Sequence, residues 1–238
     1  MCEKNNNLTS KTAGKINFNS GFNDSFLMSE AFKTLRTNLI FCGDDIKTIL
    51  VTSSTEGEGK STVSTELAIA LSQIKKKTLI IYSDMRKPNQ ICEKQNVLGL
   101  SELLSQTAVL GDALYETQTR YLNVIFSGKL AETPAELLSN DVLGELLDEL
   151  KNDYDYIIID SPPLIPVIDA ALISVHCDGA ILVIASEKTT VQEASIAKER
   201  LENGNCRILG AILNQTQDSV NSKYYGKKYG HYSGSYSK

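Results

Sequence analysis

The stretch Ser53-Ser54-Thr55-Glu56-Gly57-Glu58-Gly59-Lys60-Ser61-Thr62 decides the fold of this chain of 238 residues. The apolar run 48–52 precedes it and a helical pattern follows, which is the setting of a phosphate-binding loop. In such a loop, free backbone N–H groups and the N-terminus of the next helix face an anion. The sequence therefore predicts a nucleoside triphosphate site.

The second half of this loop carries the residues with predicted roles. The Lys60 ammonium is expected to reach the β- and γ-phosphates, and the Ser61 hydroxyl to take one position around Mg²⁺. Gly usually opens the motif, whereas Ser54 stands there. The residues expected to contact the nucleotide are Glu56, Gly57, Glu58, Gly59, Lys60, Ser61 and Thr62.

The composition of the chain excludes several classes of protein. A hydrophobic content of 42% and a charged content of 22% are ordinary for a globular domain. The net charge of −5 argues against a nucleic-acid binder, and no apolar run approaches the roughly 20 residues of a membrane-spanning helix. The five scattered cysteines form no C-x-x-C pair, which favours reduced thiols in a cytoplasmic protein over zinc or disulfides.

Short apolar runs alternate with helical patterns from residue 47 onward. The runs are rich in β-branched residues and nearly continuous, as in parallel strands covered on both faces. We expect a doubly wound, mostly parallel α/β sheet that binds its ligands at the carboxyl ends of the strands. The expected strands are 48–52, 78–82, 121–126, 156–160, 180–185 and 208–213, and the expected helices are 29–41, 61–74, 134–151, 167–174 and 190–203.

Two strand ends carry further polar residues. Asp160 closes the run 156–159 and fits a carboxylate in the Mg²⁺ shell, although an Asp that caps a turn before two prolines explains it too. Asp84 and Arg86 follow the run 78–82, where Asp84 adds to the Mg²⁺ shell and Arg86 contacts phosphate or orients a carboxylate. On spacing alone, these two residues are equally explained by a turn.

The two ends of the chain differ from its middle. Residues 1–27 have little periodicity and predict a flexible segment. Residues 217–238 form a tail without a core, and by composition alone the tail is either merely low in complexity or a contact for nucleic acid. The last fifteen residues hold five of the ten tyrosines, namely Tyr224, Tyr225, Tyr229, Tyr232 and Tyr236.

The expected first helix has Ser29 as N-cap and an apolar stripe opposite a charged face. Glu30, Lys33 and Arg36 lie on that charged face. They are either solvated charges or a contact between subunits.

These pieces together resemble the bacterial tyrosine kinases of capsular and exopolysaccharide synthesis, in their stand-alone cytoplasmic form. The resemblance runs from about residue 28 to the tail. Residues 30–38 are similar to the oligomerising helix of that family, with Lys33 where Arg is usual. Residues 54–61 resemble its Walker A loop, and residues 84–88 the second half of its additional Walker A′ strand. Residues 128–139 and the Asp160 strand also fit the family pattern.

The resemblance implies a P-loop domain related to partition ATPases, over residues 28–216 with an oligomerisation helix at 28–42. It implies ATP and Mg²⁺ as cofactors, Lys60, Asp84 and Asp160 as catalytic residues, and Asn214 at the adenine. It makes the tail tyrosines the acceptors, phosphorylated by a neighbouring subunit of a ring. It also implies an activator, the cytoplasmic segment of a transmembrane protein, which recruits the chain to the inner face of the membrane and regulates polysaccharide export.

One position departs from the family pattern. The Walker A′ strand of the family reads Asp-x-Asp-x-Arg, and Tyr82 stands in place of the first Asp. A phenol stays protonated at neutral pH and is a poor general base. An assembly module with weak or no kinase activity is therefore the first alternative. A partition-type ATPase is the second, disfavoured by the tail and by Thr55 and Glu56 where a second lysine is usual.

Overall fold

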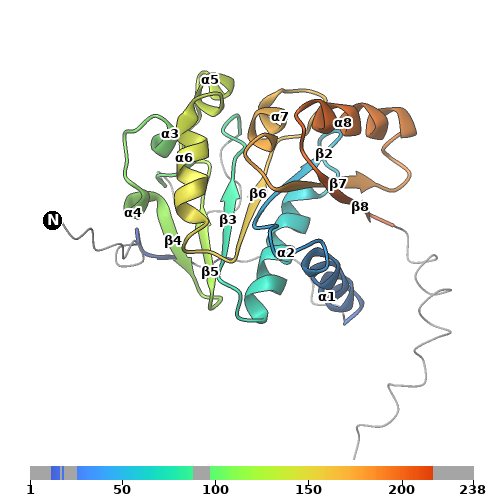
Figure 1. Cartoon of the computed structure of the whole chain (residues 1–238), viewed down its shortest axis with the longest axis horizontal. Coiled ribbons are helices and arrows are strands. Elements are labelled where there is room, and N and C mark those ends of the chain that lie inside the picture. The colour runs from blue at the N-terminus through green and yellow to red at the C-terminus, as the bar shows by residue number, and fades with distance from the viewer. Residues whose placement is uncertain (1–11, 17, 19–25, 88–96, 217–238) are drawn as a thin grey trace, which may run out of the picture.

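The structure is a computed structural model that describes residues 12–16, 18, 26–87 and 97–216. Sixteen helices and strands follow one another along this part of the chain (Figure 1). They are β1 (Lys15–Ile16), α1 (Phe26–Ile40), β2 (Thr48–Ser53), α2 (Lys60–Gln73), β3 (Thr78–Tyr82), α3 (Leu100–Leu104), α4 (Leu110–Ala113), β4 (Leu114–Thr117), β5 (Leu122–Ile125), α5 (Pro134–Leu138), α6 (Asp141–Leu150), β6 (Tyr156–Asp160), α7 (Asp169–Ser174), β7 (Gly179–Ala185), α8 (Val191–Asn203) and β8 (Ile208–Asn214).

The strands form one sheet in the order β1-β4-β5-β3-β6-β2-β7-β8. Neighbouring strands run parallel except β4 and β5, which are antiparallel. β2, which leads into the phosphate-binding loop, lies between β6 and β7 near the centre of the sheet. The expected mostly parallel, doubly wound sheet is confirmed, and it brings the ends of β2, β3 and β6 together at one edge.

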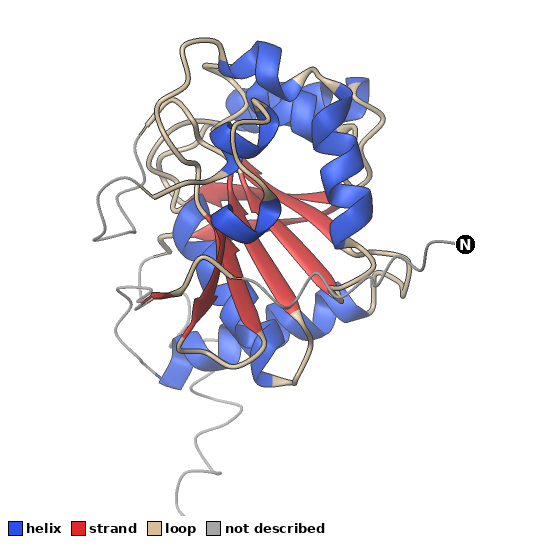
Figure 2. Ribbon diagram, turned by 90° about the vertical axis from the view of Figure 1, so that its left-hand side faces the viewer, coloured by secondary structure: helices blue, strands red, loops and turns tan. Residues whose placement is uncertain are grey.

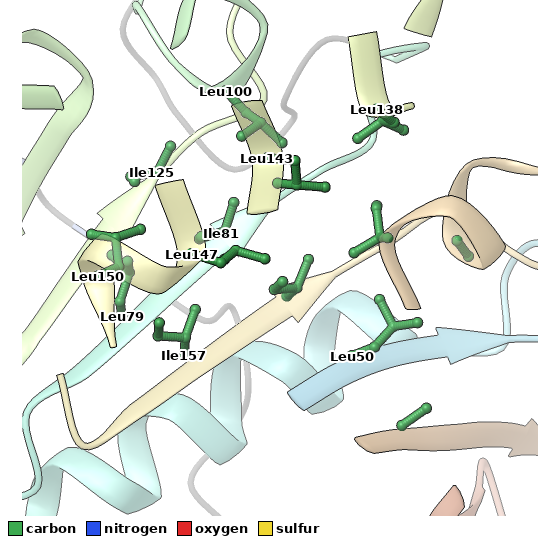
Figure 3. Packing of buried hydrophobic residues seen from close by; sticks show 14 of the residues in the cluster. Leu50, Leu79, Ile81, Leu100, Ile125, Leu138, Leu143, Leu147, Leu150 and Ile157 are labelled. Carbon is green, nitrogen blue, oxygen red and sulfur yellow. The ribbon is translucent and has the colours of Figure 1, made fainter. Parts of the chain in front are cut away.

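Figure 2 shows the sheet between two layers of helices. Successive strand residues point to opposite faces, so the central strands β2, β3, β6 and β7 contribute to both hydrophobic clusters. In β2, Leu50 packs on the face covered by α3 and α5–α8, whereas Ile49 and Val51 pack on the face covered by α1 and α2. Figure 3 shows the first cluster, in which Leu143, Leu147 and Leu150 of α6 lie against the sheet. Burial on both faces explains the continuous apolar runs of the sequence.

The structure corrects several boundaries. The helix expected at 29–41 begins at Phe26, so Ser29 lies inside α1 and is not its N-cap. The stretch 134–151 is two helices, α5 and α6, separated at Ser139 and Asn140. The short elements α3, α4 and β4 were not predicted, since four or five residues carry too little periodicity to be recognised.

The expectation of flexibility is wrong for part of the N-terminal segment. β1 pairs with β4, and the Ala13 N–H donates to the Leu114 carbonyl over 2.8 Å. Phe18 is buried beside the ring of Tyr82, with the ring centroids 6.3 Å apart. The burial of one aromatic ring and the added strand pairing outweigh the polar composition of this segment.

No helix within the described ranges is long and apolar enough to cross a membrane.

Candidate functional site

The phosphate-binding loop lies between β2 and α2 and is shaped as an anion cradle. Gly57 and Gly59 have φ angles of 76° and 86°, in the left-handed region that favours glycine. Gly59 is the N-cap residue of α2, and no side chain caps this helix. The first N–H groups of α2 and the positive end of its dipole are therefore free to bind an anion.

Asp160 ends β6, the neighbour of β2, and its carboxylate faces the start of α2. The Ser64 hydroxyl of α2 donates to Oδ1 of Asp160 over 3.1 Å. Burial raises the pKa of Asp160 to about 6, and the charge of Lys60 and hydrogen bonds from Ser61 and Ser64 partly offset that rise. Lys60, Ser61 and Asp160, which the sequence assigned to one site, are thus brought together. Asp84 is close enough to raise the pKa of Asp160 further.

This arrangement suits Mg²⁺ that arrives with a nucleotide. Within the described ranges, no group of three or more His, Cys, Asp or Glu side chains gathers as a metal site of its own. Mg²⁺ is usually bound by one or two carboxylates together with substrate phosphates and water. A hydroxyl at Ser61 and a carboxylate at Asp160 beside a phosphate cradle fit that ligand set.

Tyr82 is buried in the core rather than directed into the site. Its side chain is 2% exposed, and its ring stacks on Phe126 with the centroids 6.1 Å apart. Its hydroxyl is 2.7 Å from the Thr65 hydroxyl of α2. Burial raises the pKa of the Tyr82 phenol further above its usual value of 10. Tyr82 therefore stays protonated and cannot serve as a general base.

The turn after β3 is fixed by two carboxylates. Asp84 accepts a hydrogen bond from the Arg86 N–H over 3.1 Å. The Arg86 guanidinium binds Asp169 through two hydrogen bonds of 2.8 and 2.7 Å, a bidentate pair. Asp169 is fully buried at the start of α7 and raises the pKa of Arg86. Sequence reasoning missed Asp169, because an acidic residue in the first turn of a helix is explained by the helix dipole alone.

The acidic residues of the loop have partners of different kinds. Glu56 forms an exposed ion pair of 2.8 Å with Lys87, and that contact lowers the pKa of Glu56. The buried Glu58 carboxylate accepts hydrogen bonds from the Thr55 N–H, over 3.0 Å, and from the Thr189 hydroxyl. Glu58 thus shapes the loop from within and does not face a ligand.

The remaining predicted site residues lie beside the loop, on α1 or outside the described residues. The Asn214 side-chain amide donates to the Glu58 carbonyl over 2.9 Å, next to the loop. On α1, Lys33 pairs with Glu30 over 2.7 Å, and Arg36 donates to the Ala70 carbonyl of α2 over 2.9 Å. The five tyrosines predicted as acceptors, Tyr224, Tyr225, Tyr229, Tyr232 and Tyr236, lie outside the described residues.

Comparisons with known sequences agree with this geometry. Residues 46–202 match the family model of the AAA domain. The chain is 41% identical over 206 residues to the tyrosine-protein kinase CpsD of Streptococcus agalactiae, an alignment that covers 85% of this chain and 89% of that protein. It is 38% identical over 208 residues to the tyrosine-protein kinase YwqD of Bacillus subtilis, covering 85% and 88%.

Solved structures show the same fold. The chimerical protein CapA2B2 superposes with a TM-score of 0.77 at 35% identity, over 86% of this chain and 94% of that one. The kinase domain of the Escherichia coli tyrosine kinase ETK gives 0.75 at 33% identity, over 78% and 74%. The septum site-determining protein MinD of Pyrococcus horikoshii, solved with Mg-ADP, gives 0.61 at 26% identity, over 73% and 72%. The expected P-loop fold, related to that of partition ATPases, is confirmed.

Proposed function

The chain belongs to the family of stand-alone bacterial tyrosine kinases, and on that premise we propose that it transfers the γ-phosphoryl group of ATP to tyrosine. One observation carries the proposal. The buried Asp160 carboxylate lies next to an uncapped helix N-terminus. The charge of Lys60 and hydrogen bonds from Ser61 and Ser64 partly offset the rise in its pKa that burial causes. These are the groups that a site for phosphate and Mg²⁺ together requires.

Each residue of the site has a physical task in this reaction. The loop N–H groups and the Lys60 ammonium bind phosphate oxygens and stabilise charge on the transferring group. Ser61, Asp160 and Asp84 would hold Mg²⁺, which would neutralise phosphate charge. Thr62 and Arg86 are proposed to contact the nucleotide as well. Phosphoryl transfer has a loose transition state, so positioning matters more than proton abstraction. The lack of a base at Tyr82 is therefore expected to lower the rate without abolishing it, since general bases typically contribute about 10²–10⁴-fold.

The proposed acceptors are the tyrosines of residues 217–238, phosphorylated by a neighbouring subunit of a ring. Glu30, Lys33 and Arg36 of α1 would contribute to the subunit contact, because Glu30 and Lys33 are exposed. The proposed setting is the cytoplasmic face of the membrane, where a transmembrane activator recruits the kinase and capsular or extracellular polysaccharide is the regulated product. A relative from Klebsiella pneumoniae named a putative tyrosine-protein kinase in cps region supports this setting.

A second candidate function is favoured by the position of Tyr82. A chain without a carboxylate there could bind ATP to control ring assembly and have weak or no kinase activity. The likeness to MinD keeps a partition-type ATPase as a third candidate, although the tyrosine-rich tail has no role in it.

One experiment separates the three candidates. The full chain is incubated with Mg·ATP, with and without the cytoplasmic segment of the activator, and phosphotyrosine and released phosphate are measured. Phosphotyrosine in the tail that Lys60→Met abolishes supports the kinase. Binding of ATP without phosphotyrosine identifies the assembly module, and phosphate release without phosphotyrosine identifies the ATPase.

A further inference from the structure

Three consecutive carbonyl groups of the phosphate-binding loop are held by side chains from distant parts of the chain. Lys188 Nζ donates to the Glu56 carbonyl over 2.8 Å. Gln215 Nε2 donates to the Gly57 carbonyl over 3.0 Å, and Asn214 Nδ2 to the Glu58 carbonyl over 2.9 Å. We call Lys188, Asn214 and Gln215 the carbonyl clamp.

The sheet places these donors beside the loop. β7 pairs with β2, and β8 pairs with β7, so the ends of both strands lie next to the end of β2. Lys188 follows β7, while Asn214 closes β8 and Gln215 comes next. The Ser186 N–H donates to the Asn214 carbonyl over 2.8 Å, which ties the two parts of the clamp together.

The clamp orients the peptide groups of the loop. The C=O and N–H of a trans peptide point in opposite directions. Carbonyls drawn toward β7 and β8 therefore turn the N–H groups of the following residues, Gly57, Glu58 and Gly59, the other way. Successive N–H groups that point into one concavity form an anion-binding nest. A nest whose N–H groups are held in place by the clamp needs little rearrangement when phosphate binds.

The loop glycines are matched to the same donors. A Cβ atom on Gly57 would lie 2.8 Å from Lys188 Nζ, and one on Gly59 would overlap the Asn214 amide. Both glycines also have positive φ angles. Their lack of a side chain thus serves two purposes, the left-handed backbone and the close approach of the clamp.

We propose that Lys188, Asn214 and Gln215 are positioning residues that preorganise the phosphate cradle, an inference that rests on the nucleotide site proposed above. Their side chains contact loop carbonyls rather than reacting atoms. Asn214 thereby acquires a role that differs from the adenine contact implied by family resemblance.

The first test needs no nucleotide. Hydrogen–deuterium exchange of loop residues 54–60 is compared among the full-length wild type, Asn214→Ala, Gln215→Ala and Lys188→Met. Loss of one hydrogen bond should speed exchange about fivefold for Asn214→Ala, with smaller changes for the two exposed donors, Gln215 and Lys188. Asn152→Ala is the matched amide control, since the Asn152 amide also donates to main-chain carbonyls, but at the end of α6. Lys198→Met is the control for the lost charge, because Lys198 pairs only with Glu202 on α8 among the contacts described.

The second test is the affinity for mant-ADP with Mg²⁺, measured by fluorescence. Asn214→Ala should bind about five- to tenfold more weakly than the wild type, whereas both controls should bind normally. Two results would overturn the proposed role of the clamp. One is unchanged loop exchange in all three clamp variants, and the other is faster exchange with unchanged affinity. A wild type that fails to bind mant-ADP overturns the proposed nucleotide site instead, so the two failures are distinguishable.

Discussion

Tyr82 and Asp160 end two neighbouring strands in the same register, and their surroundings differ sharply. Both side chains are buried, and both contact α2 through a hydroxyl, Thr65 for Tyr82 and Ser64 for Asp160. The charge of Lys60 and a hydrogen bond from Ser61 also affect the pKa of Asp160, whereas the ring of Tyr82 packs against Phe126. Equivalent places at one sheet edge therefore face the phosphate-binding loop in one strand and the hydrophobic core in the next.

The largest effect is expected from a substitution of Lys60, which lies close to Asp160. Lys60→Met removes the cation that stabilises phosphate charge, and the rate of phosphotyrosine formation should fall by about 10²–10³-fold. Stability should change little, because Lys60 is only half-buried. The check is a phosphotyrosine time course beside a urea unfolding curve. A variant that retains more than a tenth of the wild-type rate would place the phosphate site elsewhere.

A substitution that places a carboxylate at position 82 tests the same comparison at the other strand end. Tyr82→Asp should lower the free energy of unfolding by about 3–5 kcal/mol, because it removes a buried ring and buries a second carboxylate near Asp160. Tyr82→Phe, which keeps the ring, should cost only about 1 kcal/mol. Urea unfolding measures both. An Asp variant as stable as the wild type would show that position 82 is open to the site.

The pH dependence of stability provides the third test. The folded-state pKa of Asp160, about 6, lies above the ordinary value of 3.8, so folding favours the protonated carboxyl. This contribution is complete below about pH 4 and is lost as the pH rises through 6. Without nucleotide and with EDTA, Asp160→Asn should exceed the wild type in stability by about 2–3 kcal/mol at pH 7, and this difference should vanish near pH 4. A difference that does not vary with pH would contradict the assignment.

The turn beyond Tyr82 allows a comparison of two ion pairs. Asp169→Asn breaks the bidentate pair with Arg86, and we expect a loss of about 1–2 kcal/mol of stability, since Arg86 is partly exposed and can return to water. Lys87→Met, which breaks the exposed pair with Glu56, should leave stability unchanged, because water screens the charges of an exposed pair. Thermal unfolding of both variants decides whether burial sets this order.

The smallest effects come from the two hydroxyls of α2. Ser64→Ala removes a hydrogen bond to Asp160 and should weaken mant-ADP binding about two- to fivefold with Mg²⁺ present. Thr65→Val removes the bond to Tyr82 and should cost about 1 kcal/mol of stability with nucleotide affinity unchanged. Equal effects of the two substitutions on affinity would erase the distinction between the two strand ends.

Sequence patterns predict those elements of the molecule that depend on residues close together in the chain. The strands around the phosphate-binding loop are long, apolar and buried on both faces, so β2, β3 and β6 could be recognised from their composition. Lys60, Ser61 and Asp160 follow from a motif and a strand end. The strand β1 could not be predicted, because two residues pair only where β4 supplies an edge.

The contacts of the site that the sequence did not reveal join residues far apart in the chain. Asp169 pairs with Arg86, and Gln215 reaches the loop, over separations of 83 and 158 positions. Which way Tyr82 points depends on Phe18 and Phe126, which lie just beyond the ends of β1 and β5. No local period or spacing encodes such contacts, since they arise only when the sheet is assembled.

The most direct test of the central claim is the rate of phosphotyrosine formation by Tyr82→Phe, with Mg·ATP and the activator segment, beside the wild type and Lys60→Met. The site is built around Lys60 and Asp160, with Tyr82 in the core. We predict that Tyr82→Phe reacts within about threefold of the wild-type rate while Lys60→Met is inactive. A loss in Tyr82→Phe as large as that in Lys60→Met would contradict this account.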